Sequence, residues 1–268
     1  MIYCHAVPGQ YSTNYCVTPD KPRLLVTRPA AQATPLCSLL EAAGYEAIRL
    51  PAIEILDPPN LYQLEALSDE LDNYDLAVFV SVNAVQKAVE FILDRRDWPE
   101  HTAIATVGAH SAEALLPYGL SSDFVPAHQF NSEALLALDE LQDMSGQRVV
   151  IFRGNGGREY LHDSLLARGA EVDYVEAYRR ACPEPDKAAL LSLLKQGYLA
   201  AITITSNEIL QNLYAMAGAA GQPLLREQQL IVVSDRQAAL ATQLGFSKPP
   251  WLASNASAEA IVAAAGAL

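Results

Sequence analysis

The chain has 268 residues, a formal net charge of −13 and an apolar fraction of 51%. This length accommodates one or two domains, each with its own hydrophobic core. The acidic balance argues against nucleic acid and anionic membranes as main partners, but an anionic small molecule could still bind at a local site of backbone N–H groups and arginines.

Taken in chain order, continuous apolar runs predict buried strands. The expected strands are 23–27, 46–50, 76–80, 101–107, 124–126, 148–152, 172–178, 200–205, 230–233 and 251–252. Apolar residues at helical spacing follow most of these runs, for example in 29–44, 111–116 and 161–167. Strands that alternate with helix-length segments predict parallel α/β sheets with right-handed crossovers.

The sequence also repeats itself with a period of about 125 residues. The shift aligns Leu25–Arg28 with Val150–Arg153, Gly44 with Gly169, and Phe79–Ser81 with Ile204–Ser206. A period this long is too large for a solenoid unit. The fold class predicted is therefore α/β, with two doubly wound parallel-sheet domains of similar topology.

Several sequence features concern the cellular location of the chain and metal binding. Residues 1–20 show no basic region followed by an apolar core, so we interpret them as an N-terminal extension without a part in the chemistry. The cysteines have no C-x-x-C spacing, which favours a reduced, cytoplasmic setting. No apolar run reaches the roughly 20 residues of a membrane helix. The histidines do not pair at metal-ligand spacing, so no metal site is predicted.

Small or hydroxyl residues occupy nearly every corner where a predicted strand ends and a helix begins. The corners are 27–29, 81–83, 108–111, 153–156, 205–207 and 234–236. At a single corner, helix capping is the better interpretation. At six corners on two domains, an anion-binding cleft between the domains becomes the better account, because ligands of parallel sheets bind beyond the carboxyl ends of the strands.

Other reaction classes find less support. The string Arg153–Arg158 lacks the spacing and the Lys-Ser/Thr of a phosphate-binding loop, so nucleotide binding there is a weaker hypothesis. Its two arginines could serve a polycarboxylate or lie on the solvated surface. No G-x-S-x-G motif is present and no cysteine has an evident base partner, which disfavours covalent catalysis. His110, at a corner, is a weak candidate.

As a set, the motifs resemble those of uroporphyrinogen-III synthases. The matching strings are Val26–Pro29, Phe79–Val85, Val107–Ala112, Phe152–Gly154 with Gly157–Arg158, Val175–Arg180, Thr205–Ser206 and Ala256–Ala260. The resemblance runs from about Arg23 to the end of the chain. Each motif is weak alone, but their order and spacing are fairly specific.

The resemblance implies a domain arrangement that periodicity does not show. One domain would comprise residues 21–50 and 180–268, and the other residues 51–179, including both strands of a two-stranded linker. The chain would cross between the domains at Leu50–Ile55 and Tyr174–Arg180, and the active site would lie in the interdomain cleft. So thin a linker would permit closure around a ligand.

The implied reaction converts hydroxymethylbilane, which carries eight carboxylates, to uroporphyrinogen III with loss of water and inversion of ring D. No cofactor is implied. Tyr178 would be the proton donor, although it could equally pack at the hinge, since a free phenol with a pKa of about 10 is a weak acid. The substrate-binding candidates are Arg28, Ser81, Asn83, Gly108, Ser111, Arg153, Ser206 and Ser234. We expect a monomer, with possible transient handover of substrate from hydroxymethylbilane synthase.

The chain departs from the family pattern in places. Val80 and Ser111 stand where threonines are usual, and Ser234–Ala238 replaces a G-x-T-T-A string. Side-chain contacts at these positions therefore do not carry over, whereas backbone N–H contacts are insensitive to the changes. The departures support an alternative from another class, a catalytically weak ligand-binding or regulatory protein on the same fold.

Overall fold

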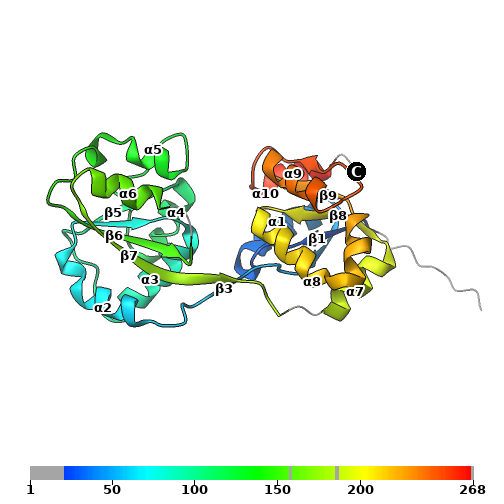
Figure 1. Cartoon of the computed structure of the whole chain (residues 1–268), viewed down its shortest axis with the longest axis horizontal. Helices are drawn as coiled ribbons and strands as arrows, with labels where there is room; N and C mark the ends of the chain where they lie inside the picture. The colour runs from blue at the N-terminus through cyan, green and yellow to red at the C-terminus, as the bar shows by residue number, and fades with distance from the viewer. Residues whose placement is uncertain (1–20, 157–158, 185–186, 267–268) are drawn as a thin grey trace, which may run out of the picture. The chain divides into compact units, whose positions relative to one another are not determined.

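The computed structural model describes residues 21–156, 159–184 and 187–266. The extension predicted for residues 1–20 lies outside them. The chain divides into two compact units (Figure 1). Unit 1 contains the residues up to Ile53 and those from Pro183 on, and unit 2 contains Glu54–Cys182. Each unit is a sheet with helices on both faces, which confirms the predicted fold class.

Unit 1 combines strands from both ends of the chain into one parallel sheet of order β10-β9-β8-β1-β2. The strands are β1 (Arg23–Val26), β2 (Glu46–Arg49), β8 (Leu199–Ile204), β9 (Leu230–Val232) and β10 (Trp251–Leu252). One face is covered by α1 (Ala30–Ala42) and α10 (Ala258–Ala265). The other face is covered by α7 (Lys187–Gln196), α8 (Asn207–Arg226) and α9 (Asp235–Gln243).

Unit 2 has the strand order β3-β7-β6-β4-β5. Its strands are β3 (Glu54–Leu56), β4 (Leu76–Phe79), β5 (Ala103–Thr106), β6 (Arg148–Gly154) and β7 (Glu171–Ala181). All pairings are parallel except that of β3 with the end of β7. Helices α2 (Tyr62–Glu70) and α3 (Val82–Leu93) cover one face, and α5 (Ser132–Leu136) and α6 (Tyr160–Ala167) the other. The short α4 (Ala109–Glu113) follows β5.

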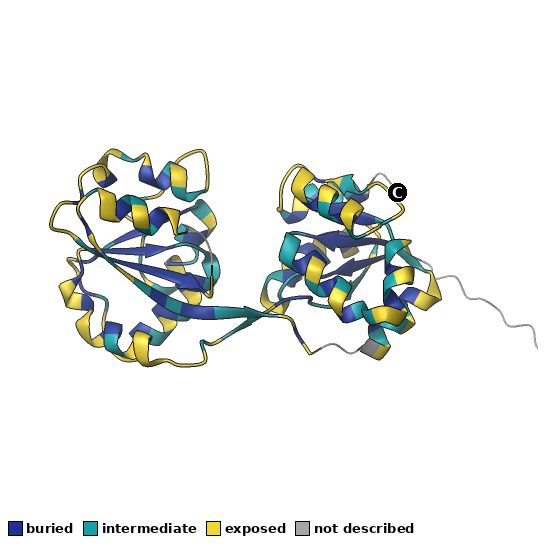
Figure 2. Ribbon diagram, in the orientation of Figure 1, coloured by how far each residue is buried: buried dark blue, intermediate teal, exposed yellow. Residues whose placement is uncertain are grey.

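The strands read as continuous apolar runs because both of their faces are covered. In β4, Ala77 and Phe79 join the core under α2 and α3, while Leu76 and Val78 join the core under α5 and α6. Figure 2 shows the strands as the most buried part of each unit. Because successive side chains point to opposite faces of the sheet, the apolar residues of one strand pack into two cores. The sequence of such a strand therefore shows no polar face.

Three details differ from the sequence expectations. The strand predicted at 124–126 is a single bridge between Ala105 and Phe124, and the next-but-one residue, Pro126, has no N–H with which to extend a ladder. The helix predicted at 111–116 is divided into α4 and the 3₁₀ turn Leu116–Tyr118, which contains Pro117. Helices α2 and α7 were not predicted.

Candidate functional site

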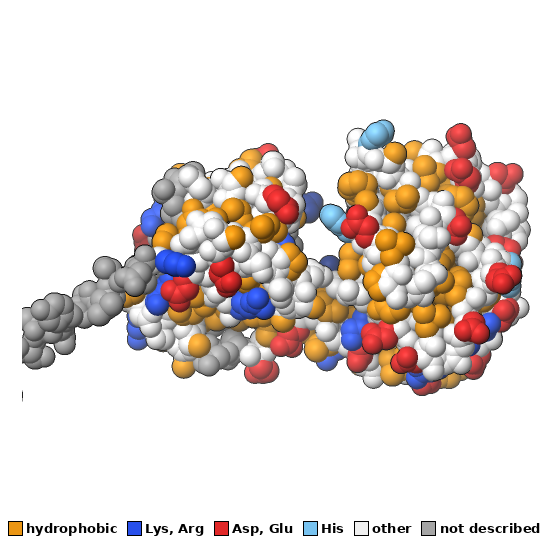
Figure 3. Space-filling model, turned by 180° about the vertical axis from the view of Figure 1, so that it is seen from behind, with side chains coloured by type: hydrophobic (Ala, Val, Ile, Leu, Met, Phe, Trp, Pro, Cys, Tyr) orange, Lys and Arg blue, Asp and Glu red, His pale blue; other side chains and the backbone are white. Residues whose placement is uncertain are grey.

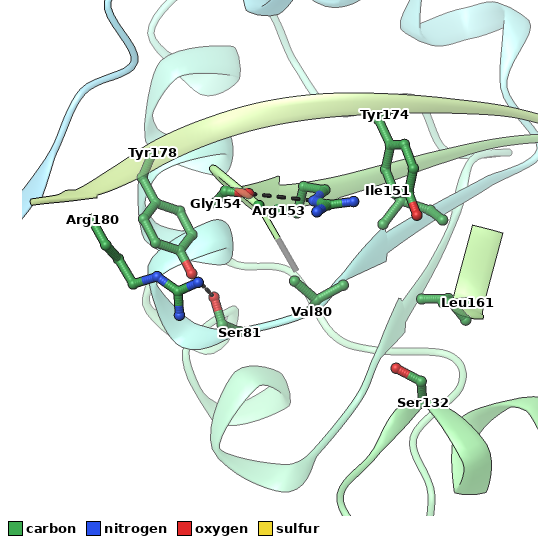
Figure 4. A pocket seen from close by; sticks show the side chains of 11 residues that line it. Val80, Ser81, Ser132, Ile151, Arg153, Gly154, Leu161, Tyr174, Tyr178 and Arg180 are labelled. Atoms are coloured by element: carbon green, nitrogen blue, oxygen red, sulfur yellow. Dashed lines mark hydrogen bonds between the residues drawn. The ribbon is translucent and has the colours of Figure 1, made fainter. Parts of the chain in front are cut away.

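A cavity of about 240 Å³ opens at the carboxyl edge of the sheet in unit 2 (Figure 4). It lies where β4 and β6 are neighbours, with β5 beyond β4 and β7 beyond β6, so the order of strand addition reverses there. Such switch points are the usual ligand sites of doubly wound sheets. The cavity is lined by Val80, Ser81, Ser132, Ile151, Arg153, Gly154, Gly156, Leu161, Tyr174, Tyr178 and Arg180.

Ser81 has two tasks at this edge. Its backbone is extended, and its Oγ accepts a hydrogen bond from the backbone N–H of Ala84 at 3.1 Å, which caps α3. The same Oγ lies 3.1 Å from the hydroxyl of Tyr178, and either of these two oxygens can donate. The start of α3 and the end of β7 are thus joined through one serine oxygen.

A β-bulge in β7 places Tyr178. Arg153 pairs with Glu176, but the next residue, Gly154, pairs with Tyr178, so Ala177 is an extra residue on β7. As a result Ala177 and Tyr178 both reach the core under α2 and α3. Bulges of this kind re-aim side chains beside functional sites.

Gly154 leaves room for the Tyr178 ring. A Cβ atom at position 154 would lie 2.6 Å from Cζ of Tyr178 and 3.0 Å from its hydroxyl. Tyr178 is 4% exposed, and Figure 4 shows its hydroxyl directed at Ser81. Bulge, glycine and serine together fix the position of one phenolic oxygen at the cavity wall.

Arg153 supplies a buried positive charge, with 8% of the residue exposed. Its Nη1 donates to Oε1 of Glu159 at 3.0 Å, and its Nε donates to the carbonyl of Gly154 at 3.3 Å. The guanidinium carbon lies 4.5 Å from the centre of the Tyr174 ring, within the range of a cation–π contact. The cavity therefore presents a cation that is neutralised by Glu159 and is also held by a backbone carbonyl and an aromatic ring.

Tyr174 forms the wall beneath this arginine. Burial raises the pKa of its phenol to about 12, and the nearby Glu159 carboxylate adds to the rise. The ring of His162 stacks on the Tyr174 ring at a centroid distance of 4.7 Å. Tyr174 thus stays neutral at physiological pH and can donate a hydrogen bond to a ligand.

A smaller cavity of about 170 Å³ adjoins the first at Val80, beyond the ends of β4 and β5. Its lining includes two predicted residues, Gly108 and the buried Ser111. Phe130 also lines it, although 60% of this residue is exposed, and its Cβ lies 3.0 Å from where a side chain at position 108 would begin. The sequence did not single out Phe130, because one aromatic residue in a loop carries no periodic signal.

The candidates in unit 1 lie at the carboxyl edge of its own sheet. Ser206 caps α8 by accepting from the N–H of Ile209 at 3.1 Å. Ser234 occupies the corresponding position before α9, where the backbone N–H of Val233 instead donates to the side chain of Gln237 at 2.8 Å. Arg28 donates to the carbonyl of Ala256, and burial lowers the pKa of its guanidinium.

The structure thus brings together some of the predicted residues and separates others. Ser81, Arg153 and Tyr178 share the larger cavity, and Gly108 and Ser111 share the smaller one. Asn83 lies in the first turn of α3 and lines neither. His110 is largely exposed and pairs with Glu113 at 3.2 Å. Tyr174, Glu159 and Ser132 were missed, since they belong to no corner or motif.

Two general features complete the site. Among the described residues, no group of three or more His, Cys, Asp or Glu side chains is placed to hold a metal ion. No helix among them is long and apolar enough to cross a membrane. Acidic side chains are visible on the surfaces of both units in Figure 3.

Comparison with known proteins gives concordant matches. The family described as Uroporphyrinogen-III synthase HemD matches residues 35–263. The chain is 35% identical to the uroporphyrinogen-III synthase of Salmonella typhimurium and 35% identical to that of Escherichia coli. Each alignment spans 90% of this chain and 98% of the relative.

A solved structure is similar in fold. A mutant uroporphyrinogen III synthase from Thermus thermophilus superimposes with a TM-score of 0.59, covering 92% of this chain and 96% of the other, at 18% sequence identity. At 18% identity this structural similarity supports the fold alone. The family membership rests on the family match and on the 35% identical relatives.

Proposed function

Because this chain belongs to the uroporphyrinogen-III synthase family, we propose that it converts hydroxymethylbilane to uroporphyrinogen III with loss of water, ring closure and inversion of ring D. The observation that carries the proposal is the 35% identity to the Escherichia coli synthase over 98% of that protein. The alternative, a catalytically weak binding protein, is not favoured by these matches.

The cavity in unit 2 is suited to part of an acidic substrate. Arg153 offers a buried guanidinium, and a carboxylate is its natural partner. We propose that Ser81, Gly108 and Ser111 complete this half of the site, with Asn83 in the first turn of α3. We propose that Arg28, Ser206 and Ser234 serve the same substrate from unit 1.

The chemistry requires a proton at one oxygen. As the bond between carbon and the hydroxyl group breaks, the hydroxyl takes a proton and leaves as water, and the carbon becomes part of a cationic azafulvene. The substrate must then be held so that attack gives the spiro intermediate rather than simple closure. We propose that these steps need no cofactor.

Tyr178 is the proposed donor, and its hydrogen bond to Ser81 bears on this role. Ser81 Oγ already accepts from the N–H of Ala84. If Ser81 donates its own proton to the Tyr178 oxygen, the phenolic proton is directed away from Ser81 and can be given to the leaving hydroxyl. The donor would then sit at the lining of the cavity.

Further proposals concern the whole chain. We propose domain boundaries of 21–50 with 180–268, and of 51–179, and a two-stranded hinge at the two crossings. The antiparallel pairing of β3 with the last residues of β7 supports the hinge. We also propose that the protein acts as a cytoplasmic monomer and receives its substrate from hydroxymethylbilane synthase.

A coupled assay tests the function. Porphobilinogen and hydroxymethylbilane synthase generate the substrate, and the porphyrin isomers are separated after oxidation. We expect isomer III to dominate when the chain is added. If isomer I alone forms, as in spontaneous closure, the proposal is wrong.

Tyr178→Phe tests the donor in the same assay. The variant keeps the ring against Gly154 and removes the hydroxyl, so packing is preserved. A general acid contributes roughly 10²- to 10⁴-fold to a rate, and we expect a loss of kcat in that range with the melting temperature nearly unchanged. An unchanged kcat would leave Tyr178 with a packing role.

A further inference from the structure

We propose that Glu159 competes with a carboxylate of the substrate for Arg153. In the free protein the Glu159 carboxylate would occupy the position that a substrate carboxylate takes on binding. This inference rests on the proposed function, which supplies a substrate rich in carboxylates. It assigns a task to a residue that belongs to none of the sequence motifs.

The first observation is the burial of Arg153. Its side chain is 10% exposed and lies at the cavity wall, so its charge is removed from most of its water. A buried charge is costly unless a partner of opposite sign accompanies it. In the free protein Glu159 is that partner, at 3.0 Å.

The second observation is that Glu159 remains open to solvent. Its side chain is 57% exposed, and its Oε1 accepts one hydrogen bond from Nη1 of Arg153 at 3.0 Å. Arg153 and the neighbouring Tyr174 together lower the pKa of its carboxyl. One-point pairs with an exposed carboxylate are weak, whereas a planar guanidinium binds carboxylates more strongly through two parallel bonds. A substrate carboxylate can therefore replace Glu159 while the arginine remains neutralised.

The third observation is that Arg153 does not depend on Glu159 for its direction. The guanidinium stacks over Tyr174 at 4.5 Å, and its Nε donates to the carbonyl of Gly154. In Figure 4 the arginine extends between these two residues. Removal of the Glu159 charge should thus leave the cation in place for a ligand.

The same two strands provide a matched control at their other ends. Arg148, which begins β6, lies 3.6 Å from the carboxylate of Glu171, which begins β7. Glu171 is 78% exposed, and neither residue lines the cavity. Glu171→Gln makes the same change in charge, beside an arginine of the same strand, away from the site.

The experiment measures binding and turnover separately. Uroporphyrin III, a stable porphyrin with the carboxylates of the product, serves as the probe in a fluorescence titration, and the coupled assay gives KM and kcat. We expect Glu159→Gln to lower Kd and KM by about two- to fivefold, the range of a weak ion pair, with kcat within about twofold of the parent. Glu171→Gln should leave all three values unchanged.

A double-mutant cycle distinguishes competition for Arg153 from a general change in the electrostatic potential of the cavity. Arg153→Met keeps much of the buried volume without the charge, and in that background Glu159→Gln should no longer change Kd. A Kd that rises in Glu159→Gln, or that falls equally in both backgrounds, would overturn the inference. If the parent protein forms no isomer III, the proposed function fails, while the titration still decides whether Glu159 competes at Arg153.

Discussion

Gly154→Ala tests whether the position of Tyr178 is set by contact with the β6 backbone. The added Cβ would lie 2.6 Å from Cζ and 2.7 Å from Cε2 of Tyr178. Carbon atoms in good contact are about 3.5–4.0 Å apart. The ring must therefore move by about 1 Å, or β6 must move away from it.

The structure sets the size of the effect. The Tyr178 hydroxyl is 3.1 Å from Ser81 Oγ, so a shift of about 1 Å away from Ser81 breaks this hydrogen bond. Because Tyr178 is 4% exposed, its ring cannot swing into solvent without disturbing the core. Overpacking of a core costs about 1–3 kcal/mol, and we expect a loss of stability in that range together with a loss of kcat.

Urea denaturation gives the stability, and the coupled assay gives kcat. Gly266→Ala is the control, because Gly266 ends α10 at φ −65° and a Cβ there meets its nearest atom at an ordinary 3.4 Å. We expect that control to change the free energy of unfolding by less than about 0.5 kcal/mol.

Combining Gly154→Ala with each of two Tyr178 variants shows whether the loss of stability is caused by contact with the ring. The clash remains in Tyr178→Phe, which keeps Cζ, and is relieved in Tyr178→Ala, which removes the ring. Gly154→Ala should therefore be costly in the first background and nearly neutral in the second. An equal cost in both would refute the steric argument.

Three further changes have expected outcomes. Ser81→Ala and Ser206→Ala should each lower stability by about 1 kcal/mol through the lost helix cap, which urea titrations compare. Ser81→Ala should in addition free the Tyr178 hydroxyl and change kcat relative to the parent protein. Gly218 has φ 58° and ψ −178°, and a Cβ added there would meet no atom within 4 Å, so Gly218→Ala should cost about 1–3 kcal/mol in urea titrations through backbone strain alone. The Tyr174 pKa of about 12 exceeds the value of about 10 for a free phenol, so the free energy of unfolding should fall as pH rises from 10 to 12. Tyr174→Phe should flatten this slope, and a slope equal to that of the parent would contradict the assignment.

The sheets were predictable because a strand that is buried on both faces has apolar residues at nearly every position. The run at Arg23–Val26 and its repeat at Arg148–Gly154 are both inner strands. Helix α2 was missed although the buried residues Leu64, Leu67 and Leu71 recur at helical spacing.

The site was predictable where it follows the strand ends. Ser81 and Arg153 both stand directly at such ends, and the cavity joins them. The bulge at Ala177 was not predictable, because one extra residue in an apolar strand changes register without changing composition. The Arg153–Glu159 pair was missed for a related reason: composition does not show which side chains meet beyond the end of β6.

The division of the chain has a consequence for synthesis on the ribosome. Unit 2 is a continuous segment, Glu54–Cys182, that can fold as soon as it has emerged. Strand β1 emerges earlier, yet its neighbour β8 begins only at Leu199. At about 5–20 residues per second, on the order of ten seconds or more separates the two. During that time β1 can pair with β2 but not with β8. We therefore expect the nascent chain to expose apolar surface of β1 and to be a substrate for chaperones.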